Sequence, residues 1–396
     1  MDDNQSSRSW FGAAIGMFAV AWGANQFVST LVAYKSQRGV SVAVNDGLFG
    51  IYALSLIGAL LLCGPAADLW GRARVVRPAV LVSMLGTVLL MLGDHSIPLL
   101  FAGRFVAGVA SGAVFAAGTA WVKELSAGAA EDSGPRRAAL ALSAGFGLGP
   151  VATGLVAQWA PHPLVIAYLP HLVVSALALP LVLRTPETLM HTGGPGFAAR
   201  LRVPAAGHRR FLTVVLPAAP WVFGAPALAF AVQPSLLTAR LHDYAILYSA
   251  LMVAVTLGTG IAVQPLARRR DQPGRRIGVS SIGLGSIIVG AGVAAIAAGL
   301  TNPWLAVVAA APLGAGYGLC LVGGLLETQR IAAPDELAGL TAVYYSLTYV
   351  GFALPLVLAV VHPVAGYPAM LVGVAVVVLL CALTVLVGSR KNQLAI

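Results

Sequence analysis

Long apolar stretches alternate with short polar ones along the whole chain. Twelve of the apolar stretches reach about 20 residues, the length that a helix needs to cross the hydrocarbon core of a bilayer. They cover residues 10–33, 47–66, 75–94, 97–122, 138–160, 163–183, 211–237, 244–266, 277–300, 303–327, 338–361 and 367–388. The pattern therefore predicts an all-α integral membrane protein with twelve transmembrane helices.

The longest polar stretch, residues 184–210, separates the sixth predicted helix from the seventh and contains five arginines. It predicts an N-terminal six-helix bundle at 1–183, a linker at 184–210 and a C-terminal six-helix bundle at 211–396. Two sets of six helices are typical of transporters built from a duplicated, pseudosymmetric repeat.

The composition excludes a soluble protein, because 58% of the residues are hydrophobic and only 10% are charged, against about 25% charged in ordinary soluble domains. The net charge of +10 comes from basic residues in short loops between apolar stretches. That placement reflects membrane topology rather than nucleic-acid binding.

Positively charged loops face the cytoplasm in most membrane proteins. With a cytoplasmic N-terminus, the outer loops hold only Lys35, Arg38 and Arg240, and the even number of helices brings the C-terminus to the same side. The reverse orientation would place almost all basic residues outside. The abundance of alanine and arginine over lysine favours a bacterial inner membrane.

A charged segment between the second and third predicted helices reads GPAADLWGRAR and begins at Gly64. Positive-inside topology explains its arginines but not Asp68 or the two glycines. The loop after the eighth helix, QPLARRRDQPGRR, is a weak echo of this segment, with Arg268 at the position of Asp68.

Gly64, Asp68, Gly71 and Arg72 resemble the signature of the loop between helices two and three in the major facilitator superfamily. Three further motifs fall in the expected order. They are Arg104-x-x-x-Gly108-x-x-x-Gly112 in the fourth helix, Gly145-x-x-x-Gly149-Pro150-x-x-x-Gly154 in the fifth, and Pro186-Glu187-Thr188 after the sixth. The resemblance implies two six-helix bundles that rock around a central site.

The resemblance also implies roles for these motifs. Asp68 and its neighbours form a gating loop that latches one side shut near the start of helix eleven, where Pro334, Asp335 and Glu336 stand. The glycine and proline motif around Pro150 is typical of the export branches, although Thr153 stands where that pattern has a second glycine.

Several polar residues inside the predicted helices are candidates for proton coupling or for the cavity. Arg104 is costly to bury and therefore indicates a cavity or a partner, with Asn25 and Gln26 at similar depth. His171 is a candidate proton carrier or a hydrogen-bonded interhelical residue. Glu327 is a candidate coupling carboxylate or an ion-pair partner of Arg330.

Helices seven, ten and eleven carry further residues that suit an amphipathic pocket. Together with Asn25 and Gln26, the predicted substrate-binding residues are Trp221, Gln233, Tyr317, Tyr345 and Tyr349. Packing is the alternative explanation for each aromatic residue.

The sequence shows no phosphate loop, no nucleophile and base pair and no metal-ligand spacing. It thus predicts neither an enzyme nor a bound cofactor or metal. Its three cysteines, Cys63, Cys320 and Cys381, suggest no disulfide framework.

The predicted function is export of a small amphipathic drug or metabolite by a monomer, in exchange for protons. The first alternative is a facilitator or symporter for nutrient uptake, favoured by the lack of a carboxylate deep in helices one, two, five, seven and eight. A non-transporting receptor on the same scaffold is the second alternative.

Overall fold

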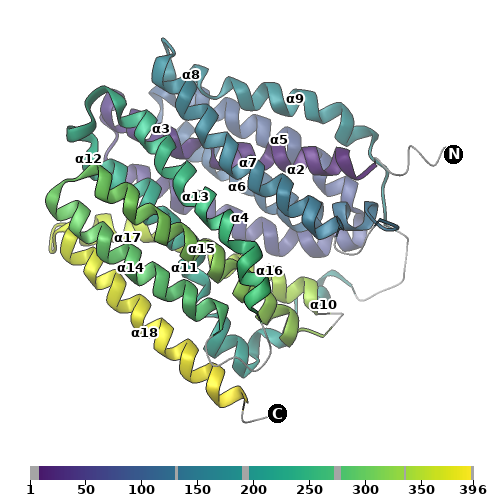
Figure 1. Cartoon of the computed structure of the whole chain (residues 1–396). Coiled ribbons are helices and arrows are strands. Elements are labelled where there is room, and N and C mark those ends of the chain that lie inside the picture. The colour runs from purple at the N-terminus through teal and green to yellow at the C-terminus, as the bar shows by residue number, and fades with distance from the viewer. Residues whose placement is uncertain (1–8, 130–132, 190–195, 272–277, 334–335, 394–396) are drawn as a thin grey trace. The chain divides into compact units, whose positions relative to one another are not determined.

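The computed structural model of the chain consists of helices joined by short turns (Figure 1), and the part that it describes contains no strand. The described residues are 9–129, 133–189, 196–271, 278–333 and 336–393. The predicted all-helical fold is therefore confirmed.

The first half of the chain contains the helices α2 to α10. Their bounds are α2 Ser9–Asn25, α3 Phe27–Arg38, α4 Val42–Trp70, α5 Arg72–Leu92, η1 Gly93–His95, α6 Ile97–Leu125, α7 Ser133–Trp159, α8 Pro163–Ile166, α9 Leu169–Arg184 and α10 Phe197–Arg200. The first predicted span is thus two consecutive helices, since the α-helical pattern is interrupted at Gln26.

The second half runs from η2 to α18. Its elements are η2 Pro204–Gly207, η3 Phe211–Val215, α11 Ala219–Ala227, η4 Leu228–Val232, α12 Gln233–Leu241, η5 His242–Tyr244, α13 Ala245–Arg270, α14 Val279–Leu300, α15 Pro303–Ile331, α16 Leu337–Tyr349, η6 Val350–Ala353, α17 Leu354–Val361 and α18 Tyr367–Gln393. Two of the short elements, η3 and η4, are π-helical.

Among the described residues, 11 helical stretches are long and apolar enough to cross a membrane. One of them, Phe211–Arg270, is 60 residues long and covers two predicted crossings. The crossings are separated at His242, which has a positive φ of 46° and begins a single 3-10 turn. All twelve predicted crossings are therefore found.

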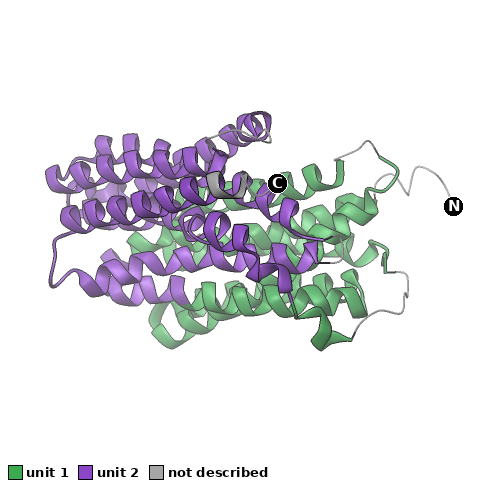
Figure 2. Ribbon diagram, turned by 90° about the horizontal axis from the view of Figure 1, so that it is seen from below, with its two compact units in different colours: residues 1–33, 51–202 green, residues 34–50, 203–396 purple. Residues whose placement is uncertain are grey.

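The chain divides into two compact units (Figure 2). Unit 1 contains residues 1–33 and 51–202, and unit 2 contains residues 34–50 and 203–396. The second half of α3 and the start of α4 thus pack with the helices of unit 2. The domain division made from the polar linker stays a prediction.

Small residues let the helices of each unit approach closely. In unit 1, a Cβ on Gly112 of α6 would lie 2.7 Å from the Leu60 backbone nitrogen of α4. In unit 2, a Cβ on Gly283 of α14 would lie 3.0 Å from the Cys320 backbone nitrogen of α15. The glycines of the fourth predicted span therefore serve helix packing.

Large apolar side chains remain exposed along the outer helices. On α18 they include Val376, Leu380, Leu383 and Val387, each about half exposed. A soluble protein rarely exposes so continuous an apolar face. This face suits contact with lipid.

Candidate functional site

The segment predicted to form the gating loop, residues 64–72, contributes to a network of charges at the junction of α4 and α5 in unit 1. Asp68, near the end of α4, pairs with Arg72 at the start of α5. Arg72 also pairs with Glu124 at the end of α6, 3.1 Å away, and Arg200 lies 3.8 Å from Asp68. The carboxylate predicted from the motif is therefore held by arginines of its own unit.

The turn between the two helices depends on Gly71, whose φ of 115° suits glycine alone. A Cβ at this position would also lie 2.7 Å from the Glu187 carboxyl carbon. Gly64 lies one turn before Asp68. A Cβ on Gly64 would meet only the Ala116 side chain, at 3.9 Å.

Glu187 caps the N-terminus of α5. Its carboxylate accepts hydrogen bonds from the backbone N–H groups of Arg72 at 2.9 Å and Ala73 at 3.0 Å. Partial burial raises the pKa of Glu187, but bonds from the backbone N–H groups of Leu189, Thr188, Arg72 and Ala73 outweigh it and leave the pKa below its ordinary value. The sequence motif after helix six thus caps the helix that follows the predicted gating loop, a role that sequence analysis did not assign.

A second charged network lies in unit 2 and is centred on Glu327 of α15. Arg210 donates to both carboxylate oxygens of Glu327, at 2.6 and 3.0 Å, and Arg330 donates to Oε1 at 2.8 Å. The bond to Glu327 raises the pKa of Arg210 above its ordinary value. Glu327 thus forms ion pairs with two arginines, and the pair with Arg330 is one of the two roles predicted for it.

The segment after the eighth predicted helix, which weakly resembles the segment that begins at Gly64, also contains an acidic residue that forms an ion pair. Asp271, directly after α13, pairs with Arg330. Sequence analysis aligned Arg268 with Asp68 and overlooked Asp271, because the spacing differs by three residues. Of the predicted latch partners, Pro334 and Asp335 lie outside the described residues, so the latch stays a prediction.

Arg104 of α6 is only 1% exposed and lies deep in unit 1. Its guanidinium carbon lies 4.1 Å from the centre of the Tyr52 ring and 4.7 Å from that of Phe27, and Nη1 donates to the Ala24 carbonyl at 3.2 Å. A guanidinium group stacks well on aromatic faces. Two aromatic rings and a backbone carbonyl therefore hold the charge in the bundle.

Gln26 and His171 belong to a buried polar network between α5 and α9. The Gln26 side chain donates to Thr87 Oγ1 at 2.8 Å, and the same oxygen lies 2.8 Å from His171 Nδ1. Ser175 Oγ lies 3.1 Å from His171 Nε2. His171 is therefore hydrogen-bonded between helices, and the Gln26 Oε1 atom has no partner among the described groups.

The glycine and proline motif packs α7 against α2. A Cβ on Gly145 would lie 2.9 Å from the Trp22 nitrogen, and one on Gly149 would lie 2.8 Å from the Trp22 oxygen. Gly154 is buried on the same helix.

Pro150 lacks an N–H group and cannot satisfy the Phe146 carbonyl one turn earlier. Asn25 does so instead, since its Nδ2 donates to that carbonyl at 2.9 Å. Ser29 also donates to the Pro150 carbonyl at 2.7 Å. The hydroxyl of Thr153, which replaces a glycine of the motif, is buried without a partner in the described structure.

Two of the predicted pocket aromatics in unit 2 meet at Phe223 of α11. Its ring centroid lies 4.5 Å from that of Tyr349, 5.0 Å from Phe352 and 5.9 Å from Tyr317. Phe49, from the start of α4, extends the group through Phe352 at 5.7 Å. Sequence analysis missed Phe223, Phe352 and Phe49.

The other predicted pocket residues lie outside this aromatic group. Tyr345 contacts Tyr344, with ring centroids 5.6 Å apart, and Trp221 is buried on α11. Gln233 donates to the Ala294 carbonyl at 3.0 Å, while its Oε1 is unpartnered among described groups.

One buried carboxylate received no role from the sequence. Asp46 of α4 is 9% exposed and interacts electrostatically with Lys35 of α3, whose Nζ donates to the Ser235 carbonyl at 2.8 Å. The burial depends on the packing of three helices of unit 2, which a hydropathy pattern does not reveal.

Comparison with known proteins identifies the class. The sequence matches the family described as the Major Facilitator Superfamily over residues 13–355. The chain therefore belongs to the major facilitator superfamily and is a multi-pass membrane transporter, not an enzyme. We found no match among curated protein sequences.

Solved transporter structures share this fold at low sequence identity. The human organic anion transporter MFSD10 (TETRAN) is 18% identical with a TM-score of 0.67, covering 97% of this chain and 100% of its own. The nucleoside transporter NupG, solved as a point mutant, is 13% identical with a TM-score of 0.74, covering 96% and 99%. The POT family transporter PepTSo is 13% identical with a TM-score of 0.74, covering 98% and 99%.

Proposed function

We propose that the protein exports a small amphipathic compound, a drug or secondary metabolite, in exchange for protons. The observation that carries export is the interface between α2 and α7. There Gly145 and Gly149 allow backbone contact, and Asn25 bonds the carbonyl that Pro150 leaves free. These contacts give the residues of the export motif a structural purpose in this chain.

The substrate class rests on the groups available within each unit. Unit 1 offers the stacked guanidinium of Arg104 beside Tyr52, and unit 2 offers the aromatic group around Phe223. Aromatic surface with few hydrogen-bonding groups suits a flat or amphipathic solute better than a sugar. The transporter works as a monomer in a bacterial inner membrane, with both termini in the cytoplasm.

Uptake without protons is the second candidate, and the state of Glu327 favours it. Two arginines already bond this carboxylate, so it serves in ion pairs that hold the end of α15. Proton exchange then requires another carboxylate, and the buried Asp46 is the candidate that we propose.

Purified protein in liposomes with an internal pH-sensitive dye distinguishes the two candidates. A proton gradient is imposed, and lipophilic cations, organic anions, antibiotics and sugars are added in turn. Wild type is compared with Arg104→Ala, Glu327→Gln and Asp46→Asn, and the exposed Asp243→Asn is the matched control.

Antiport predicts substrate-dependent proton flux that persists in Asp243→Asn and is lost in Asp46→Asn. Substrate movement without any proton signal, equal in wild type and Asp46→Asn, would leave a facilitator. Flux of sugars alone would contradict the proposed substrate class.

A further inference from the structure

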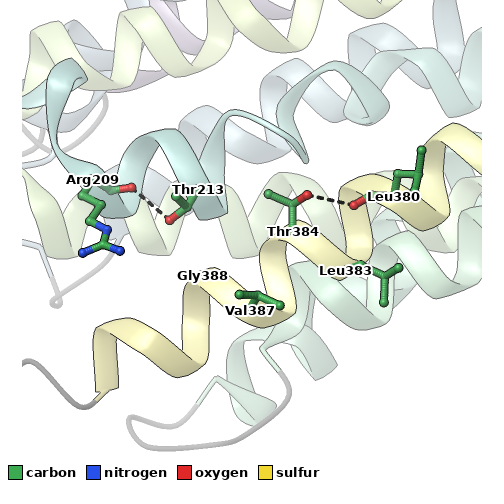
Figure 3. Close-up of a pocket in the computed structure, with 7 residues that line it drawn as sticks. All are labelled: Arg209, Thr213, Leu380, Leu383, Thr384, Val387 and Gly388. Atoms are coloured by element: carbon green, nitrogen blue, oxygen red, sulfur yellow. Dashed lines mark hydrogen bonds between the residues drawn. The ribbon is translucent and has the colours of Figure 1, made fainter.

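An open groove lies on the surface of unit 2 between η3 and the end of α18 (Figure 3). Its volume is about 460 Å³, and its lining residues are Arg209, Thr213, Leu380, Leu383, Thr384, Val387 and Gly388. None of them is a predicted substrate-binding residue. The groove therefore lies apart from the predicted substrate-binding residues.

The position of the groove along the two spans places it at a membrane boundary. Arg209 precedes the apolar stretch that begins at Phe211, and Gly388 lies next to the end of the stretch Tyr367–Ser389. From Gly388 to Leu380 the groove follows α18 for ~12 Å at 1.5 Å per residue. One end thus lies at headgroup level and the other reaches into the hydrocarbon.

The two ends of the groove differ in chemistry, as Figure 3 shows. The part of the groove that reaches into the hydrocarbon is apolar, and Leu380, Leu383 and Val387 are each half exposed or more. The hydroxyls of Thr213 and Thr384 donate to carbonyls of their own helices, each at 2.9 Å, namely Arg209 and Leu380. The walls therefore offer few free hydrogen-bond donors to water.

Arg209 supplies the charge at the end of the groove that lies at headgroup level. It is exposed, and no carboxylate among the described residues forms an ion pair with it. Its neighbour Arg210 differs, since Glu327 neutralises that side chain. An unneutralised guanidinium at headgroup level attracts an anionic lipid phosphate.

Gly388 shapes the groove by letting α18 approach η3. A Cβ at this position would lie 2.8 Å from Thr213 Oγ1 and 3.1 Å from the Thr213 carbonyl oxygen. The π-helical turn of η3, Phe211–Val215, lies on the opposite wall. Such turns occur frequently at functional sites.

We propose that this groove binds one anionic phospholipid, with its phosphate on Arg209 and an acyl chain along Leu383 and Leu380. A lipid matches both the charge at one end of the groove and the apolar surface along the rest. Free phosphate would interact only with the charge. The site requires only that the protein spans a membrane and is independent of the transported substrate.

Native mass spectrometry of the purified, delipidated full chain tests the proposal, with phosphatidylglycerol as the probe and phosphatidylcholine as the zwitterionic comparison. Arg209→Gln removes the charge, and Val387→Trp fills the groove without changing charge. Arg269→Gln, another exposed arginine of unit 2, is the matched control. Thermal unfolding establishes that each variant is folded.

We expect phosphatidylglycerol to bind about fivefold more weakly to Arg209→Gln, more weakly still to Val387→Trp, and unchanged to Arg269→Gln. Equal loss in Arg209→Gln and Arg269→Gln would show diffuse charge attraction and overturn the proposal. Unchanged binding to Val387→Trp, or complete displacement by inorganic phosphate, would also overturn it.

Discussion

Glu187 acts at the scale of a single side chain, because its carboxylate occupies the N-terminal end of α5. The bonds to Arg72 and Ala73 N–H groups and the helix dipole both favour a negative charge there. We expect Glu187→Ala to lower the free energy of unfolding by about 1 kcal/mol, the usual cost of a lost cap. Thermal unfolding in detergent measures the change, and Glu336→Ala is a carboxylate control.

The same carboxylate predicts a dependence on pH. Its pKa is lower in the folded protein than in the unfolded chain, so its stabilising contribution is complete above the ordinary glutamate pKa of about 4.3. The contribution disappears as pH falls through the lowered pKa. The difference in melting temperature between wild type and Glu187→Gln should therefore be constant from pH 6 to about 5 and shrink in stronger acid. A difference that grows on acidification would contradict the cap.

Arg104 shows how a membrane-embedded charge is accommodated by aromatic faces. Lysine keeps the charge but lacks the planar group that lies 4.1 Å from the Tyr52 ring centre. Arg104→Lys should lower the unfolding free energy by about 1–2 kcal/mol, the range for desolvated cation–π contacts. Phe105→Leu, on the exposed face of the same helix, should change little.

A double-mutant cycle separates this contact from general repacking. Tyr52→Leu removes the ring, and its effect should be smaller when Arg104 is already lysine. Strictly additive effects would show that the ring and the guanidinium do not interact.

At the scale of elements, a proline in α7 determines a hydrogen bond made by Asn25. Asn25→Ala should cost about 1 kcal/mol, because the partly buried Phe146 carbonyl is left without a donor. In a Pro150→Ala background the new backbone N–H group can satisfy this carbonyl, so the same change should cost less. Chemical unfolding of the four proteins in the cycle measures the coupling, and an unchanged cost in both backgrounds would contradict it.

The elements themselves were predictable to a much greater degree than their polar contacts. Hydropathy located α14 and α15 within a few residues, because each helix must bury about 20 apolar residues in lipid. The capping of α5 by Glu187 was not predictable, because the two partners lie 115 residues apart along the chain. Similarly, the ion pair of Asp271 was not predictable, because alignment of the two halves pointed to Arg268, three residues earlier in the chain.

Helix packing also explains which predicted site residues come together. Tyr317 of α15 and Tyr349 at the end of α16 come together only through Phe223 of α11, whose ring contacts both. Their spacing in sequence contains no sign of this contact. Conversely, the glycines at four-residue intervals in α7 form one narrow stripe on that helix, and α2 contacts this stripe at Trp22.

At the scale of the whole molecule, the charges predict the orientation of the chain in its membrane. Arg240 lies one residue before the end of α12 and Arg269 one residue before the end of α13, and both side chains are exposed. About 26 residues of helix separate the ends of α13, or ~39 Å, enough to place the two arginines on opposite sides. The positive-inside rule then puts Arg240 outside and Arg269 in the cytoplasm.

Cysteine labelling tests this orientation in cells. In a background with Cys63, Cys320 and Cys381 replaced by alanine, a membrane-impermeant maleimide should label Arg240→Cys in intact cells. It should label Arg269→Cys only after the membrane is permeabilised, which also proves that this cysteine is reactive. The opposite result would invert the protein and with it the side on which the network of Glu327 lies, because Asp271 of that network directly follows α13 and pairs with Arg330, which also pairs with Glu327. A transporter so inverted would present its arginine-rich loops outside, against the charge bias that governs insertion.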